Sequence, residues 1–119
     1  MVCTYDLEDR LVDFSSKVIQ LVELLPTTKS AAYIGNQMIR CGVAPSLLYG
    51  EAQGAESRDD FVHKMKVALK ELKETRISLK LVVKNGMVKN IDSLCRENEE
   101  LIAVFAKSIE TAKNNRHVK

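Results

Sequence analysis

The stretch that decides the fold is residues 57–86, SRDDFVHKMKVALKELKETRISLKLVVKNG. Its apolar residues recur at steps of three and four, the spacing of one face of an α-helix. Ser57, followed by a short acidic residue three positions on, resembles a capping box, and Asn85-Gly86 supplies a stop. A helix over about residues 58–85 is therefore predicted. The face expected in the core consists of Phe61, Met65, Ala68, Leu72, Leu79 and Val83.

Segments at the two ends of the chain show the same periodicity. Residues 7–25 predict a helix that has Asp6 as its N-cap and ends before a proline. Residues 93–114 predict another, with Asp92 as its N-cap. Asn98 interrupts the apolar seam of this last helix, and a polar residue at such a position more often sets helix register than binds a ligand.

The remaining segment, residues 28–54, contains a proline. Pro45 lacks a backbone donor and its ring clashes with the preceding turn of a helix. The apolar register nevertheless continues past it. We therefore expect one helix, kinked near Pro45, with Thr27 or Thr28 as its N-cap.

The four predicted helices are joined by connections of a few residues, which favour antiparallel neighbours. No segment shows the alternation of a strand. The 119 residues fit one domain, and 45% apolar with 29% charged residues is an ordinary globular balance. The expected fold class is all-α: a single antiparallel up-down four-helix bundle over residues 1–119.

The net charge and the cysteines of the chain indicate the cellular compartment in which it works. The formal net charge of +2 does not by itself indicate a nucleic-acid-binding protein. The start lacks the pattern of a signal peptide, and no apolar run approaches the roughly 20 residues of a membrane span. Cys3, Cys41 and Cys95 are odd in number and far apart, which is typical of thiols in a reducing compartment. We expect a cytoplasmic protein with no membrane partner.

Residues 49–61, YGEAQGAESRDDF, have two interpretations: a phosphate-binding or catalytic loop, or a corner between two helices. A Walker-type loop needs a Lys-Ser or Lys-Thr pair after a buried strand, and both are missing. On a helix, Gly50 and Gly54 instead form a surface of small residues that another backbone can approach. We interpret the stretch as a helix–helix corner.

Catalytic and metal-binding patterns are also missing. The chain has two histidines, and the nearest approach to a di-iron motif is a lone Asp60-x-x-His63. Cysteine and histidine do not cluster as a zinc site requires, and no motif gives a serine or cysteine a histidine base. Glu51 and Glu56 are a weak candidate for a catalytic pair. We predict no catalytic, cofactor-binding or metal-binding residue, no small-molecule substrate, and a protein that is not an enzyme.

A basic stripe runs along the helix predicted over residues 58–85. Its lysines project from one side, almost opposite the expected core face. The stripe is either a solvated face or a surface that contacts nucleic-acid phosphates and binds them in a salt-sensitive way. Aromatic residues for base stacking are missing, so binding would read backbone shape. The candidate nucleic-acid-binding residues are Lys66, Lys70, Lys73, Arg76, Lys80 and Lys84.

Further apolar residues fall outside the expected core. Scattered exposed apolar residues are normal on a monomer, but an extra apolar stripe on several helices favours self-association. We expect a homo-oligomer. The residues concerned are Val12, Ile19, Ile39, Val43, Leu47, Val67, Ile77 and Leu81.

The run from Ile39 to Val82 resembles the bacterial "four helix bundle protein" family, whose founding members are encoded in intervening sequences of 23S ribosomal RNA genes. YDLEDRLVDFSSKVIQLVELLP and ENEELIAVFAKSIETAKNNR are similar to it as well, so the resemblance covers about residues 5–115. Its most specific part is an E-A-x-x-A/G-x-S-x-x-D-F signature followed by A-L-K-E-L-x-E-T. The signature residues here are Glu51, Ala52, Ser57, Asp60 and Phe61.

This resemblance implies an antiparallel four-helix bundle that assembles as a ring-like homopentamer. It implies association with ribosomal RNA, and a related retroelement accessory protein binds nucleic acid and a reverse transcriptase. It offers no catalytic residues. The family's recurrent polar positions are matched by Arg40, Glu51, Ser57 and Arg58.

Two hypotheses of function remain open. The leading one is a non-enzymatic, oligomeric helical scaffold whose lysine and arginine surface binds structured RNA or another nucleic acid. The alternative is a protein–protein interaction scaffold or adaptor that has no nucleic-acid role.

Overall fold

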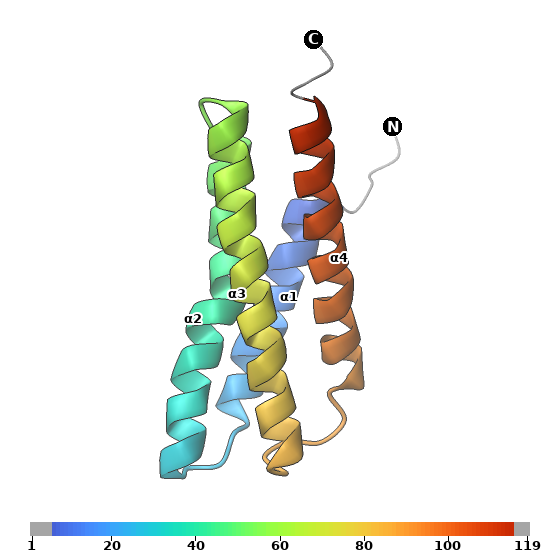
Figure 1. Ribbon diagram of the computed structural model, residues 1–119. Coiled ribbons are helices and arrows are strands. Elements are labelled where there is room, and N and C mark those ends of the chain that lie inside the picture. Colours follow the sequence, from blue (N-terminus) through green and yellow to red (C-terminus); the bar gives the residue numbers. More distant parts are fainter. Residues whose placement is uncertain (1–5, 116–119) are drawn as a thin grey trace.

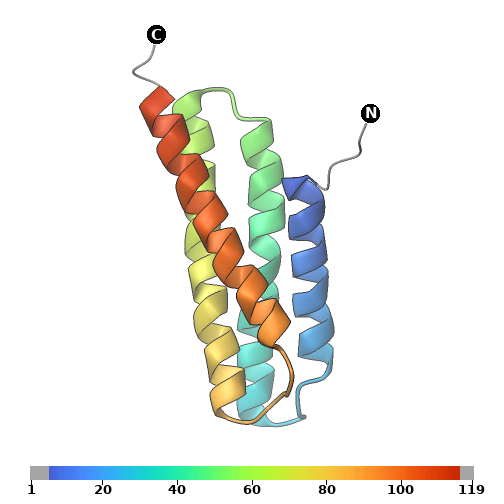
Figure 2. The same ribbon diagram turned by 90° about the vertical axis from the view of Figure 1, so that its right-hand side faces the viewer.

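The computed structural model describes residues 6–115, which form four α-helices and no strand (Figures 1 and 2). The helices are α1 (Leu7–Glu23), α2 (Lys29–Gln53), α3 (Arg58–Lys84) and α4 (Asp92–Asn115). Figure 1 shows that each helix runs in the opposite direction to the one before it. The predicted all-α class with four helices is confirmed, and the observed helix ends lie within two residues of the predicted ones.

Local side-chain chemistry sets most of the helix ends. Asp6, Thr28 and Ser57 each accept a hydrogen bond from the amide three residues on, at 2.9, 3.2 and 3.1 Å, and cap α1, α2 and α3. Beyond the C-terminus of α3, Gly86 takes the left-handed conformation, with φ of 64°. These ends agree with the interpretation of the sequence.

Helix α4 begins one residue earlier than predicted. The Ile91 carbonyl already accepts a helical hydrogen bond from the Cys95 amide at 3.0 Å, so Asp92 is the first helical residue and not the N-cap. Its carboxylate still lies in the first turn, where negative charge is favourable. Helix α2, by contrast, runs through Pro45 as the single element that its apolar register predicts.

The apolar faces of the four helices meet along the bundle axis. In α3, however, the buried arc differs from the predicted one at both ends. Val62 and Val82 are buried, whereas Phe61 is only half-buried and Val83 is 51% exposed. An α-helix drifts by roughly 20° per heptad relative to a straight seam, so a contact face followed over the length of α3 moves around the helix. The fully buried larger apolar side chains are Leu11, Phe14, Val18, Met38, Met65, Leu72, Leu79, Val82, Leu101 and Phe105.

Helices α1 and α2 approach each other closely at a glycine. A Cβ atom added to Gly42 would lie 2.6 Å from Cγ1 of Val18. At the same level the Ser15 hydroxyl donates a hydrogen bond of 2.8 Å to the Gly42 carbonyl. No other part of the described chain lies within 4 Å of a Cβ added to Gly50, so the close approach inside the subunit is not at the Gly50/Gly54 pair that the sequence indicated.

Helices α1 and α4 meet over a short stretch only. In Figure 2, α4 crosses the bundle obliquely in front of the other helices. One bidentate contact joins them: Arg10 donates to the Glu97 carboxylate at 2.6 and 3.0 Å and to Glu100 at 2.7 Å. Beside this contact the two helices leave a cleft.

Candidate nucleic-acid interface

The five lysines of the α3 stripe, Lys66, Lys70, Lys73, Lys80 and Lys84, are all exposed. None of them forms a hydrogen bond or ion pair with another described residue. At about 1.5 Å per helical residue the stripe is about 27 Å long from its first to its last lysine. The structure thus places the five ammonium groups on one helix without an ion-pair partner among residues 6–115.

Arg76, the sixth predicted residue, is placed differently. It is half-buried, and its guanidinium contacts Glu99 of α4 at 3.3 Å. Glu74, one helical turn after Lys70, is held by Arg40 at 2.8 Å. The hydrogen bond from Arg40 is the main cause of the lowered pKa of Glu74, and the charge of Lys70 adds a smaller attraction without forming an ion pair.

Arg40 joins α2 to α3. Its guanidinium contacts the largely buried carboxylate of Glu71 at 3.0 Å and that of Glu74 at 2.8 Å. The hydrogen bond to Glu74 raises the pKa of Arg40 and lowers the pKa of Glu74. Leaving Glu71 buried without a cation would be costly, so this family polar position has a structural role in the fold.

The other family polar positions surround the corner between α2 and α3. Glu51 accepts a hydrogen bond of 2.9 Å from Lys64, and this contact raises the pKa of the lysine. Ser57 is the N-cap of α3, and Arg58 is its exposed first residue. His63 is exposed on the following turn. The contacts of Glu51 and Ser57 fit the helix–helix corner inferred from the sequence.

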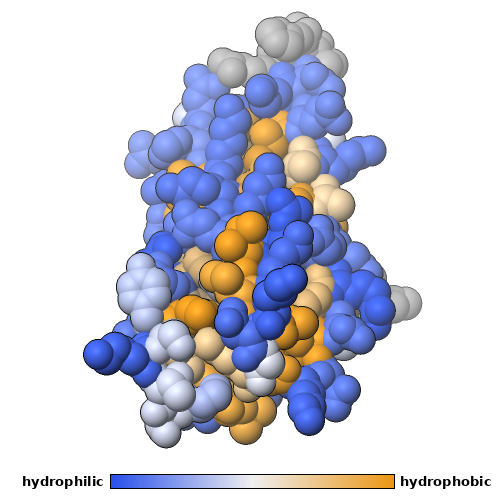
Figure 3. Space-filling view, turned by 60° about the horizontal axis from the view of Figure 1, so that its bottom comes forward, coloured by the Kyte–Doolittle hydropathy of each residue, from blue (hydrophilic) through white to orange (hydrophobic). Residues whose placement is uncertain are grey.

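Apolar side chains line the side of α3 that faces α2. Ile77 and Leu81, which are 55% and 43% exposed, lie there with Tyr33 of α2. Tyr33 lines two shallow hollows, of about 370 and 740 Å³, the first with Ile77 and Arg40 and the second with Leu81. Seen toward the lower end of the bundle, hydrophobic surface lies between hydrophilic flanks (Figure 3). The α3 surface is therefore mixed, basic toward solvent and apolar toward α2.

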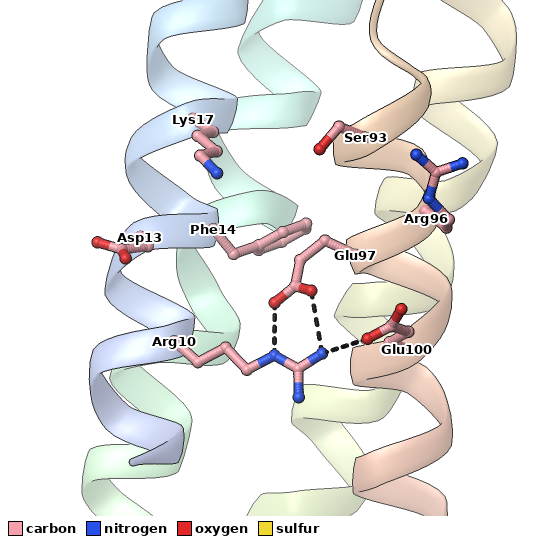
Figure 4. A pocket seen from close by; sticks show the side chains of 8 residues that line it. All are labelled: Arg10, Asp13, Phe14, Lys17, Ser93, Arg96, Glu97 and Glu100. Carbon is pink, nitrogen blue, oxygen red and sulfur yellow. Dashed lines mark hydrogen bonds and ion pairs between the residues drawn. The ribbon is translucent and has the colours of Figure 1, made fainter. Parts of the chain in front are cut away.

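The cleft between α1 and α4 is a second polar site, of about 550 Å³ (Figure 4). Phe14 lies at its base, between the two helices. Sequence reasoning missed this site because its residues come from opposite ends of the chain. Its charged and polar lining consists of Arg10, Asp13, Lys17, Ser93, Arg96, Glu97 and Glu100.

The described cysteines are not paired with each other. Cys41 is buried and Cys95 half-buried, and burial raises the pKa of both thiols. Cys3 lies outside the described residues. Within residues 6–115, no three His, Cys, Asp or Glu side chains gather as a metal site would need. No helix in this range combines the length and apolar character needed to cross a membrane.

Fold and surface together define a class, the small four-helix-bundle proteins that carry an exposed basic helix. The chain belongs to the 23S rRNA-intervening sequence protein family, whose model matches residues 6–107. This confirms the resemblance noted from the sequence. No curated protein matches significantly.

A solved structure shows the same fold. It is the crystal structure of a protein of unknown function from the S23 ribosomal protein family of Bacteroides thetaiotaomicron. The two chains are 24% identical and superpose with a TM-score of 0.81 over 87% of this chain and 98% of the other. At this identity the similarity supports the fold and leaves the function to be argued from the surface.

Proposed function

We propose that this protein is a non-enzymatic, oligomeric scaffold that binds structured RNA through the lysine stripe of α3. One observation carries the proposal: the charge of the stripe is not used by the fold. Arg10, Arg40, Lys64 and Arg76 all form ion pairs within the subunit, whereas the five stripe lysines form none.

The mechanism is electrostatic docking to phosphates. Each phosphate that a lysine neutralises releases condensed counterions, so the logarithm of the affinity falls with the logarithm of the salt concentration, with a slope of about −0.7 to −0.9 per contact. Five contacts give a slope of about −3.5 to −4.5. Because no aromatic side chain lies among the lysines, the contacts follow the backbone shape of the RNA and not its sequence.

Fluorescence anisotropy of a labelled structured RNA, titrated at low and at near-physiological salt, tests this proposal. The decisive variant is Lys73→Glu/Lys80→Glu. Its matched control is Lys107→Glu/Lys113→Glu, which makes the same charge change at exposed, unpaired lysines of α4. The α3 variant should lose most of its affinity and about two units of salt slope, whereas the control should lose less. No binding at low salt, or equal losses in both variants, would refute the proposal.

Self-association is the second part of the proposal, and the apolar face formed by α1 and α2 supports it. Val12, Ile19, Ile39 and Leu47 are all between 38% and 65% exposed on these two helices. The Ser15–Gly42 contact brings the two helices together at this level, and we expect their outward apolar residues to share one surface. Together with the family resemblance, this surface supports a ring-like homo-oligomer, a pentamer by analogy.

Analytical ultracentrifugation measures the assembly directly. Ile39→Glu/Leu47→Glu should reduce the mass to that of the monomer, because burying two carboxylates in an apolar contact is strongly unfavourable. Val83→Glu, at an exposed apolar residue of α3, is the control and should leave the mass unchanged. A wild-type monomer at micromolar concentration would rule out this part of the proposal.

The alternative function is a protein–protein adaptor, which the hollows around Tyr33, Ile77 and Leu81 favour. It predicts that charge reversal of Lys73 and Lys80 leaves the biological activity intact. The RNA titration therefore separates the two functions.

A further inference from the structure

A cavity between α3 and α4, called the α3–α4 cavity below, has a buried polar side chain in its lining. The cavity has a volume of about 270 Å³ and is lined by Asn98 of α4 and Leu79 of α3. Both residues are only 1% exposed, so they form its floor. The rest of the lining consists of Arg76, Lys80, Asp92, Cys95, Arg96 and Glu99.

One atom of Asn98 lacks a partner. Its Nδ2 donates a hydrogen bond of 3.3 Å to the Leu72 carbonyl, and Leu72 does not line the cavity. Its Oδ1 is buried and has no donor among residues 6–115. A buried acceptor without a donor is unfavourable and uncommon in folded proteins. The floor of the α3–α4 cavity therefore has an unused acceptor, which a ligand with an N–H or O–H group would satisfy.

The rim of the α3–α4 cavity carries more positive than negative charge. Three cations and two anions line it, and one of each, Arg76 and Glu99, are paired at 3.3 Å. Neither Lys80 nor Arg96 forms an ion pair with another described residue. Planar guanidinium groups stack on nucleobases, and the Leu79 side chain adds an apolar surface. The rim thus suits a flat, uncharged ring that is attached to a phosphate.

We propose that the α3–α4 cavity binds a nucleobase, one N–H group of which donates to Oδ1 of Asn98. Ionised phosphate and carboxylate groups have acceptors only, whereas the pairing edge of a base also has a donor. The volume is below the roughly 300–1,000 Å³ of typical ligand pockets, which suits a ligand as small as one base. Because Oδ1 is covered, the base reaches it by pushing aside the long side chains at the rim.

Lys80 connects the α3–α4 cavity with the basic stripe of α3, because it belongs to both. An unpaired base of an RNA held by the stripe can enter the cavity while Lys80 contacts a neighbouring phosphate, and in that case the inference rests on the proposed function. A free nucleoside or nucleotide offers the same N–H group. The experiment must therefore distinguish a base within RNA from a free one.

Ligand-observed NMR of the full chain tests the site with two probes, adenosine and N6,N6-dimethyladenosine. The two methyl groups remove the N–H donors of the base and keep its ring and ribose. The variants are Asn98→Leu and Asn98→Ala, which both remove the acceptor, the second without filling the cavity. Asn114→Leu, at an exposed residue of α4, is the control. Circular dichroism verifies that each variant folds.

The expected result is a preference that depends on Asn98. The wild type and the Asn114→Leu control should bind adenosine about tenfold more tightly than dimethyladenosine, because only adenosine donates to the buried acceptor. Both Asn98 variants should lose this preference. A wild type that binds neither nucleoside or binds both equally, or an Asn98→Ala variant that keeps the preference, overturns the inference. The acceptor is then met by water only.

Two RNA titrations separate this inference from the proposed function. If Asn98→Ala weakens the binding of an RNA with an unpaired adenosine but not that of a fully paired RNA, the bound base belongs to RNA. If it weakens only the binding of adenosine, the ligand is a free nucleoside or nucleotide. A wild type that prefers adenosine but binds no RNA keeps the cavity site and refutes the RNA scaffold. Conversely, RNA binding without a preference for adenosine keeps the scaffold and overturns the cavity site.

Discussion

Substitution of Gly42 by alanine should destabilise the subunit, although alanine is the better helix former. The added Cβ would lie 2.6 Å from Cγ1 of Val18 and 3.1 Å from Cβ of the same residue. Val18 is fully buried, and a β-branched side chain in a helix has essentially one χ1 rotamer, so it cannot turn away. Helices α1 and α2 must therefore separate, which strains the hydrogen bond from Ser15 to the Gly42 carbonyl.

The magnitude follows from two opposing effects. Overpacking of a filled interface destabilises the fold by about 1–3 kcal/mol. Replacing glycine lowers the backbone entropy of the unfolded chain, which stabilises the fold by about 0.5–1 kcal/mol. Gly42→Ala should thus lower the free energy of unfolding by about 1–2 kcal/mol. Gly50→Ala is the matched control, because its Cβ meets no atom within 4 Å, and it should raise the same quantity by about 0.5–1 kcal/mol.

Urea unfolding followed by circular dichroism, at one fixed protein concentration, measures both variants. The double variant Val18→Ala/Gly42→Ala removes the clashing methyl groups and should lose less stability than the two single variants added together. If Gly42→Ala proves as stable as Gly50→Ala, the close packing of α1 on α2 is wrong.

Three further perturbations test other contacts. Arg10→Gln removes the cation that contacts both Glu97 and Glu100. Because the three side chains are partly exposed, we expect the free energy of unfolding to fall by about 1 kcal/mol at low salt and by less at high salt. A loss that does not depend on salt would contradict the ion-pair explanation. Burial raises the pKa of the Cys41 thiol, so as the pH rises this thiol ionises in the unfolded chain before it ionises in the folded one. The neutral buried thiol therefore contributes fully to stability below about pH 8.5, and this contribution is lost as the pH rises through the pKa of the folded state. Urea midpoints at neutral and alkaline pH should therefore fall less steeply for Cys41→Ala than for the wild type, and identical slopes would argue against a buried thiol. The side-chain amide of Asn98 donates a hydrogen bond of 3.3 Å to the Leu72 carbonyl, but its Oδ1 has no donor among the described residues. Asn98→Leu should therefore be at least as stable as the wild type, whereas Asn98→Ala should lower the free energy of unfolding by about 2 kcal/mol. Equal losses in the two variants would show that the fold needs the buried amide.

The sequence was sufficient for the helices because their signals are local. A cap such as Ser57 and a stop such as Gly86 act within one turn, and steps of three and four residues define a face without knowledge of the neighbours. The exposure of the α3 lysines follows from the same periodicity. The placement of Val83 failed, and Phe61 packs against the core without being fully buried, because burial depends on how far the contact face moves around a helix that packs against two others.

The contacts between helices could not be read in this way. Which glycine of α2 contacts α1 depends on the offset of the two helices along the bundle axis. Neither segment determines that offset by itself. Likewise, Lys17 and Arg96 are separated by most of the chain, and only the oblique course of α4 leaves a cleft between them (Figure 2). Arg40 was noted as a family polar position, but its role became clear only from the buried carboxylate of Glu71 beside it.

The distribution of surface chemistry over the bundle explains how assembly and RNA binding are compatible in the proposed scaffold. Consecutive helices are neighbours, and α1 makes no extended contact with α3, so the α1–α2 face and the α3–α4 side point in different directions. Val12, Ile19, Ile39 and Leu47 are assigned to the first, whereas the α3 lysines, Arg76 and Arg96 lie on the second. Subunits that associate through the α1–α2 face would therefore keep their cations in solvent, and a ring would present several copies of the same basic surface to one RNA. Binding through several subunits multiplies affinity without new contacts, provided that the geometry lets them engage together. A net charge of only +2 is then no obstacle to RNA binding, because what acts on the RNA is the repeated local charge of α3 and not the charge of the whole chain.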